Sequence, residues 1–363
     1  MGKQKKNDKK KNSIPQPIEI SSTKKMPFVS ICTPTFNRRP FIPIMIECFK
    51  HQTYPKDRME WIIIDDGTDE VKDVFAPFFD VYNIKYFKYD TKMTLGKKRN
   101  LAHEQCSGDI ILYMDDDDYY PPQRVSHAVE TLQKNPTALC VGSSIMYIYF
   151  KHITKMYQFG PYGPSHSTAA TFAFRKELLK QTKYDDDACL AEEKQFLKNY
   201  TIPFAQLEPL KSILVFSHIH NSFDKKTLLN GAPNDYVKES SVSVNEFIKE
   251  DDIKQFFMED IDGLLDAYDD GKPEHKPDVM KQMQEISDKR QKIIDNHTKQ
   301  QQIHNKRNEY DNSSKINEIT MVMNELLLEN NQLKDKVKYL EEKITKIITK
   351  QIEEKKLQIT KKT

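Results

Sequence analysis

Residues 109–122, with the sequence DIILYMDDDDYYPP, decide the fold of this chain. The stretch begins as an apolar run of strand length and ends in four consecutive aspartates at 115–118. Ligands of open α/β sheets bind outside the carboxyl ends of the strands, so polar residues at this point are candidate site residues. Adjacent carboxylates repel one another, and a divalent ion such as Mg²⁺ or Mn²⁺ relieves that repulsion. An exposed acidic loop is the alternative, but the position at a strand end favours a metal.

Similar apolar runs, separated by amphipathic stretches, lie on both sides of this segment. The runs typical of buried strands are 28–32, 61–64, 84–89, 109–114 and 140–150. The stretches that favour helices are 40–50, 94–106 and 121–134. Alternation of this kind predicts an α/β fold, in which a mostly parallel sheet is covered by helices on both faces.

Two further polar clusters follow predicted strands. Residues 33–38 (TPTFNR) come after the first strand, and residues 65–68 (DDGT) come after the second. Taken alone, the first is a turn leading into a helix. The second is equally compatible with an Asx-type turn that caps a helix. Neither cluster establishes a function by itself.

Composition divides the 363 residues into four parts. Residues 1–25 hold eight lysines against two acids and have no apolar pattern, which predicts a disordered tail. Residues 26–229 form the predicted α/β domain, and residues 230–312 an acidic, partly helical connector. Residues 313–360 have a heptad pattern. The net charge of +2 excludes a uniformly basic nucleic-acid binder, so nucleic acid is not an expected partner.

The heptad pattern predicts a coiled coil. Its apolar seam alternates in steps of three and four: Ile316, Ile319, Met323, Leu326, Asn330, Leu333, Val337, Leu340, Ile344 and Ile347. The single polar residue on this seam is Asn330, and one asparagine at such a position fixes register and favours a dimer. We therefore expect a homo-oligomer through 313–360, whereas a solvated helix without a partner is the alternative.

Four motifs taken in order resemble family 2 glycosyltransferases of the GT-A fold. They are 33–38, 65–68, the basic stretch GKKRN at 96–100, and 115–124. The resemblance covers roughly residues 26–220. It implies an α/β/α sandwich, a nucleotide-sugar donor and a metal-binding Asp-x-Asp (DxD) motif. The added acidic and coiled-coil segments are not part of that family's core.

The resemblance also implies which residues bind the donor. Pro34, Thr35 and Phe36 match the loop under the nucleobase, and Arg38 ends the same motif. The turn that hydrogen-bonds the base is matched by Asp65 and Asp66, and the basic position near base and diphosphate by Lys98 and Arg99.

The Asp-x-Asp motif is matched by Asp115 and Asp117. By analogy Asp117 binds the metal, and Asp115 or Asp116 contacts ribose or sugar. The run of four aspartates permits a shift of register by one, so Asp115 also stays a candidate metal ligand. His218 follows the apolar run 213–216 and matches the late histidine that completes some metal sites of this fold. A structural histidine is the alternative.

The catalytic base is expected at Glu192 or Glu193. The family has an acidic pair at the start of a helix here, and its second member acts as the base. Because both residues are glutamates in this chain, the choice stays open, with Glu193 preferred. An acidic first helical turn without a catalytic role is the alternative.

These residues together predict a metal-dependent, inverting glycosyltransferase. The expected donor is a UDP-sugar, and the expected acceptor is a hydroxyl of a glycan, protein or small molecule. The main alternative is a non-catalytic coiled-coil interaction protein with a degenerate GT-A domain. A nucleotidyltransferase ranks lower, because residues 33–38 contain no glycine for a phosphate loop.

The sequence also predicts a cytoplasmic location. It contains no apolar run of 18 residues, so no transmembrane helix is expected, and no secretory signal is visible. Five scattered cysteines without metal-binding spacing are typical of reduced thiols. The Lys-, Ile- and Asn-rich, glycine-poor composition is typical of an AT-rich genome, such as that of a large DNA virus or a protist.

Overall fold

The computed structural model describes residues 26–190, 193–230 and 234–360, the side chains of 304, 306–314 and 356–360 excepted. It divides into two compact units, Met1–Gln284 and Glu285–Thr363. We describe each unit by itself.

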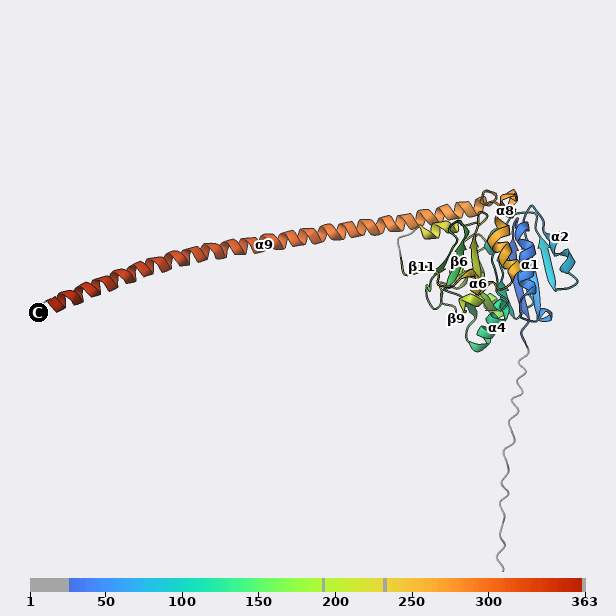
Figure 1. Cartoon of the computed structure of the whole chain (residues 1–363), viewed down its shortest axis with the longest axis horizontal. Coiled ribbons are helices and arrows are strands. Elements are labelled where there is room, and N and C mark those ends of the chain that lie inside the picture. The colour runs from blue at the N-terminus through green and yellow to red at the C-terminus, as the bar shows by residue number, and fades with distance from the viewer. Residues whose placement is uncertain (1–25, 191–192, 231–233, 361–363) are drawn as a thin grey trace, which may run out of the picture. The chain divides into compact units, whose positions relative to one another are not determined.

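The first unit is built on a seven-stranded sheet with the order β3-β2-β1-β4-β8-β5-β9 (Figure 1). Strands β1 to β4 run parallel, β8 is antiparallel to both β4 and β5, and β9 is parallel to β5. The strands are β1 (Val29–Thr35), β2 (Met59–Asp65), β3 (Ile84–Lys88), β4 (Ile110–Tyr113), β5 (Cys140–Gly142), β8 (Ala173–Arg175) and β9 (Phe204–Gln206). The predicted α/β fold with a mostly parallel sheet is therefore confirmed.

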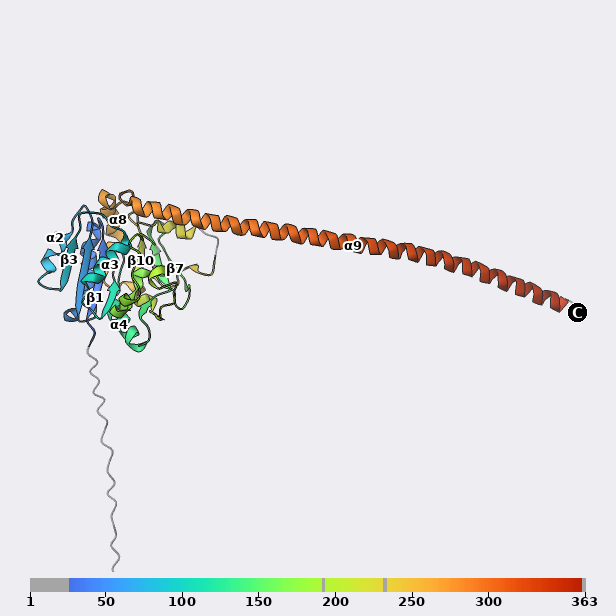
Figure 2. The ribbon, with the colours of Figure 1, turned by 180° about the vertical axis from the view of Figure 1, so that it is seen from behind.

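Helices cover both faces of this sheet because its central strands are apolar on both sides. Trp61 and Ile63 of β2 belong to one core cluster, whereas Ile62 and Ile64, which alternate with them, belong to another. The first cluster contains side chains of α1 (Ile42–Lys50) and α4 (Arg124–Lys134), and the second those of α3 (Leu95–Gln105). Figure 1 shows α1 on one side of the sheet, and Figure 2, seen from behind, shows α3 on the other. The short helix α2 (Lys72–Phe75) follows β2.

A second sheet of four strands has the order β10-β6-β7-β11. Its strands are β6 (Met146–Phe150), β7 (Lys155–Phe159), β10 (Leu214–Ser217) and β11 (Val237–Glu239). The prediction of one strand over 140–150 is wrong, because the chain leaves the first sheet after Gly142. The Ser143 backbone N–H then donates to Thr171 Oγ1 at 2.9 Å instead of continuing a strand ladder. A Cβ at Gly142 would lie 2.2 Å from Ser167 Oγ, so only glycine fits this crossing.

The apolar positions of the acidic segment pack onto the α/β domain. This segment contains α6 (Val244–Phe247), α7 (Asp251–Gln255), a π-helical turn (Phe256–Asp260) and α8 (Ile261–Asp266). Phe247, Ile253 and Phe257 belong to the main core, and the Phe257 ring stacks on Phe216 with centroids 4.4 Å apart. Its acidic side chains are exposed, except that of Glu250, which is half-buried and accepts the Tyr119 hydroxyl at 3.0 Å. The segment is therefore amphipathic rather than uniformly polar.

Helix α9 (Pro277–Thr360) starts in the first unit and makes up almost all of the second. The predicted seam positions on it are exposed, with Leu326 at 60%, Leu333 at 55% and Leu340 at 49%. Within the described ranges, no helix combines the length and the apolar character that crossing a membrane requires.

If residues 244–266 are integral to the fold, removing the Phe257 side chain will destabilise the first unit. We expect Phe257→Ala to lower the free energy of unfolding by about 3–5 kcal/mol, because a buried aromatic ring is lost and a cavity remains. The free energy of unfolding is measured by urea denaturation, followed by the fluorescence of Trp61. This residue is the single tryptophan of the chain and is fully buried. Leu264→Ala on α8 is the control, since Leu264 is 47% exposed. Equal stability of both variants would mean that the segment is not docked.

Candidate functional site

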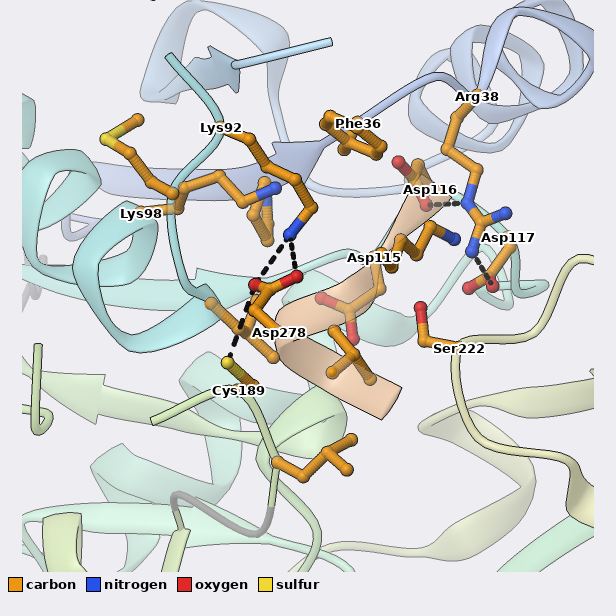
Figure 3. Close-up of a pocket in the computed structure, with 16 residues that line it drawn as sticks. Phe36, Arg38, Lys92, Lys98, Asp115, Asp116, Asp117, Cys189, Ser222 and Asp278 are labelled. Atoms are coloured by element: carbon orange, nitrogen blue, oxygen red, sulfur yellow. Dashed lines mark hydrogen bonds and ion pairs between the residues drawn. The ribbon is translucent and has the colours of Figure 1, made fainter. Parts of the chain in front are cut away.

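A concentration of polar side chains surrounds a cavity at the carboxyl ends of β1 and β4. The strand order changes direction between these two strands, which leaves a crevice where ligands bind in open α/β sheets. A cavity of about 190 Å³ occupies this place (Figure 3). Of the residues predicted from the sequence, the following line it: Pro34, Phe36, Arg38, Lys98, Asp115, Asp116 and Asp117.

The loop after β1 is fixed by a residue that the sequence analysis did not single out, Asn37. Its backbone is left-handed, with φ of +50°. Its side-chain amide donates to Thr68 Oγ1 at 3.0 Å, and its carbonyl oxygen accepts the Asp69 backbone N–H at 3.0 Å. These bonds join the loop after β1 to the loop after β2 and leave Phe36 in the cavity wall. The ammonium groups of Lys92 and Lys98 lie 5.2 and 5.9 Å from the Phe36 ring centroid, within range of cation–π attraction.

The two aspartates at the end of β2 have different partners. Asp65 caps its own turn, because its carboxylate accepts the Gly67 backbone N–H at 2.8 Å and the Tyr86 hydroxyl. Asp66 pairs with Lys98 at 2.8 Å and accepts the Met93 backbone N–H. Neither carboxylate is part of the cavity wall, but Asp66 holds Lys98 there. Lys98 also donates to the carbonyl of Thr35, the last residue of β1, at 3.2 Å.

The aspartates after β4 form ion pairs with two different arginines. Asp115 lies 3.8 Å from Arg99, whereas Asp116 and Asp117 share Arg38, at 3.5 and 3.3 Å. Figure 3 shows the Arg38 guanidinium between the Asp116 and Asp117 carboxylates. One guanidinium therefore compensates two neighbouring negative charges.

Burial and neighbouring charges separate the pKa values of these carboxylates. Burial raises the pKa of Asp116 to about 7, against the effect of Arg38, and it raises the pKa of Asp118 well above its usual value. Asp117 is half-buried, and this loss of hydration also disfavours its charge, but a hydrogen bond with His218 and the charge of Arg38 hold its pKa well below the usual value. Among Asp116, Asp117 and Asp118, Asp117 is thus the carboxylate whose ionised form is favoured at neutral pH.

Asp117 and His218, two of the predicted metal ligands of this site, lie next to each other. His218 Nε2 lies 3.3 Å from Asp117 Oδ2. Burial lowers the pKa of His218 to about 3, so its imidazole is neutral at pH 7, which is the form that binds metals. Within the described ranges, no three His, Cys, Asp or Glu side chains are grouped closely enough to hold an ion alone. A metal here would need substrate oxygens or water as further ligands, as Mg²⁺ sites commonly do.

Two other predicted residues, Arg99 and Glu193, are not part of the cavity wall. Arg99 is buried, and its guanidinium carbon lies 4.2 Å from the Tyr113 ring centroid. Glu193 is half-buried and begins α5 (Glu193–Phe196), three residues after Leu190 of the cavity wall. The alternative base Glu192 lies outside the described residues. The ring of Phe196, which stacks on Tyr184 with centroids 4.3 Å apart, anchors α5.

One wall of the cavity comes from residues that sequence reasoning missed. Lys276, Asp278 and Val279 line it, together with Lys92 from the loop before α3. Lys92 Nζ lies 2.6 Å from Asp278 Oδ2. No local pattern marks Lys276 or Asp278, because both follow a long acidic segment and only the tertiary fold brings them to β1.

Comparison with known proteins matches residues 30–196 to the family model of glycosyl transferase family 2. Among curated proteins, the poly(ribitol-phosphate) beta-N-acetylglucosaminyltransferase TarS of Staphylococcus aureus is 27% identical over 108 residues, which are 29% of this chain and 19% of TarS. Glycosyltransferase AglE of Haloferax volcanii is 30% identical over 131 residues, 35% of this chain and 42% of AglE. Among solved structures, S. aureus TarS 1–349 in complex with UDP has a TM-score of 0.43 at 20% identity, covering 53% of this chain and 61% of that one.

The matched segments span less than half the length of these two curated relatives. The family match runs from β1 to α5 and contains the loops after β1 and β4 that line the cavity. Residues 30–196, a little under half of the chain, are therefore similar to glycosyl transferase family 2.

Proposed function

We propose that this chain is a metal-dependent, inverting glycosyltransferase that moves a sugar from a UDP-linked donor to a hydroxyl acceptor. The main support is the cavity itself, in which the ionised Asp117 meets several cations, with the neutral His218 imidazole 3.3 Å from Asp117. Arg38, Lys98 and Asp117 lie inside the segment that matches the family. A nucleoside diphosphate needs positive charge around its phosphates and a surface for its base. The cavity offers both.

The nucleobase end of the donor is assigned to the loop after β1. Pro34 and Phe36 supply an apolar surface on which a uracil ring can stack. Lys98, held by Asp66, lies on the same side of the cavity and would approach the base or the α-phosphate. Asp115 and Asp116 line the middle of the cavity and are assigned to the ribose or the sugar.

The diphosphate end is assigned to Asp117, His218 and Arg38. Asp117 and His218 would hold a Mn²⁺ or Mg²⁺ ion, which acts as a Lewis acid on the departing diphosphate. Arg38 now spans Asp116 and Asp117. An ion at Asp117 would compete with that ion pair and release the guanidinium toward the phosphates.

Glu193 is the preferred general base, with Glu192 as the alternative. The acceptor hydroxyl oxygen attacks the anomeric carbon, and the bond from that carbon to the diphosphate oxygen breaks. The hydroxyl proton passes to the glutamate carboxylate, and the nucleoside diphosphate leaves with the bonding electron pair. Attack from the face opposite the leaving group inverts the anomeric carbon. The acceptor can be a hydroxyl of a glycan, a protein or a small molecule.

Residues 313–360 are assigned to a coiled-coil dimer formed with a second copy of the chain. The apolar seam of α9 is exposed in the single chain, and its leucines would be buried against the same residues of a partner. Asn330 on the seam would pair with its counterpart and fix the register. The dimer would join two catalytic domains.

The metal assignment predicts the effect of Asp117→Asn. We expect this variant to lose metal-dependent UDP release from its UDP-sugar by at least about 100-fold, because one carboxylate charge at the metal is removed. Nucleotide release from a panel of UDP-sugars, with Mn²⁺ and with EDTA, measures this. Asp251→Asn, whose side chain is 94% exposed, is the matched control. Turnover that survives both EDTA and Asp117→Asn would refute the metal assignment.

If Glu193 is the general base, replacing it should slow the chemical step without weakening the binding of UDP. Glu193→Gln should bind UDP with unchanged affinity and yet turn over the donor about 100-fold more slowly, because the proton acceptor is lost. Calorimetry gives the affinity and single-turnover assays give the rate. Glu192→Gln is the comparison variant. If Glu192→Gln has the larger defect, the base is Glu192; if neither variant slows turnover, the base lies elsewhere.

The coiled-coil assignment predicts the effect of a charge on the seam. Leu333→Lys should convert a dimer into a monomer in sedimentation equilibrium, because a lysine would replace a leucine in the apolar interface. Leu328→Lys is the control, since Leu328 is also exposed, at 63%, but lies off the seam. A wild-type chain that sediments as a monomer would exclude the dimer.

A further inference from the structure

One wall of the candidate donor site is built by a segment that lies beyond the family match. Residues 268–279 follow that match by more than 70 residues. The Tyr268 hydroxyl donates to Asp69 Oδ2 at 2.7 Å, and the Asp270 carbonyl accepts the Asn37 side-chain amide at 2.9 Å. The backbone at Gly271 packs closely against His220 and the loop after β1. A Cβ at this position would lie only 2.5 Å from His220 Nδ1 and 2.9 Å from the Asn37 carbonyl oxygen. The segment is thus fitted to the loops after β1 and β2.

The other end of the segment is also fixed. Asp278 pairs with Lys92, and Figure 3 shows this pair across the cavity below Phe36. One turn later, Gln282 Oε1 accepts the backbone N–H groups of Cys189 and Leu190, each at 2.8 Å. Lys276 lies between these two anchors and is 4% exposed.

Lys276 differs from the other cations of the cavity in its partners. Arg38, Lys92 and Lys98 each have a carboxylate within 3.5 Å. For Lys276, the described part of the chain gives one hydrogen bond, from Nζ to the His220 carbonyl at 3.4 Å, and no carboxylate within 4.0 Å. A buried ammonium with one long bond is poorly compensated.

The electrostatic surroundings of Lys276 agree with its geometry. Burial, followed by the charge of Arg38, lowers the pKa of Lys276 to about 6, and Asp117 and Asp116 offset this only in part. Lys276 Nζ and Arg38 Nη1 both donate to the His220 carbonyl, at 3.4 and 2.8 Å, so the amine lies beside Arg38 at the Asp117 end of the cavity. A bound anion would supply negative charge there and favour the ammonium form.

We propose that Lys276 binds the diphosphate of the nucleotide donor, as a cation supplied from outside the family segment. This inference rests on the proposed function and names a further residue of the same site. A diphosphate placed near Asp117 would lie on the side of the cavity that Lys276 faces. Phe36 and the Lys92–Asp278 pair occupy the nucleobase side. The alternative is that Lys276 only balances the charges of Asp116 and Asp117.

Comparison of UDP with uridine separates the two roles, because both ligands contain the base and the ribose but only UDP has phosphates. The full chain is titrated in Mn²⁺ with UDP by calorimetry and with uridine by ligand-observed NMR. We expect Lys276→Met to weaken UDP binding at least tenfold and to change uridine binding less than twofold. Lys276→Arg should retain most of the UDP affinity. Lys272→Met is the matched control, since Lys272 lies four residues away and pairs with Asp269 at 2.6 Å.

The possible outcomes are distinct. Equal loss of UDP and uridine binding in Lys276→Met, with no rescue by Lys276→Arg, would assign Lys276 a structural role and overturn the inference. Unchanged UDP binding in Lys276→Met would overturn it as well, while the proposed function would stand. If the wild-type chain binds neither UDP nor uridine, the proposed UDP-sugar donor itself fails, and the inference fails with it. Urea unfolding followed by Trp61 fluorescence verifies that each variant is folded.

Discussion

Charge compensation at the end of β4 is the constraint on which the rest of the site depends. Four consecutive aspartates cannot all be ionised in a buried position unless cations surround them. Arg38 from the loop after β1 compensates Asp116 and Asp117, and Arg99 from α3 lies beside Asp115. These contacts draw the loop after β1 and helix α3 to the same edge of the sheet. The cavity lies between them because the strand order reverses at β1 and β4.

Much of the fold could be predicted because its signals are local. The runs that become β1, β2 and β4 are apolar on both sides, and each ends in a polar motif. The same reasoning placed Phe36, Lys98 and Asp117 at one edge of the sheet, and all three line the cavity. Arg99 follows Lys98 in the sequence but points into the core, because neighbouring helical residues face different directions. Spacing alone does not tell which of two adjacent cations faces the ligand.

The features that could not be predicted from the sequence depend on contacts between residues that lie far apart in the chain. The spacing of Phe247, Ile253 and Phe257 was visible as an amphipathic pattern within an acidic segment. Periodicity identifies an apolar face but not the surface that covers it, and here that surface is the core of the α/β domain. Likewise, Lys276 is one lysine among many, and only the fold brings it to the cavity. The boundary at 229 marks a change in composition, whereas the compact unit continues to Gln284.

The anchoring of residues 268–282 to the cavity also bears on how such a chain can change in evolution. Insertions or deletions between Tyr268 and Gln282 would shift Lys276 and Asp278 away from their partners, so this length is constrained as strictly as a catalytic loop. Farther along α9, the seam repeats every seven residues. Whole heptads can be gained or lost there while the seam keeps its register. Related chains should therefore vary in the length of the distal helix and conserve the spacing from Tyr268 to Gln282.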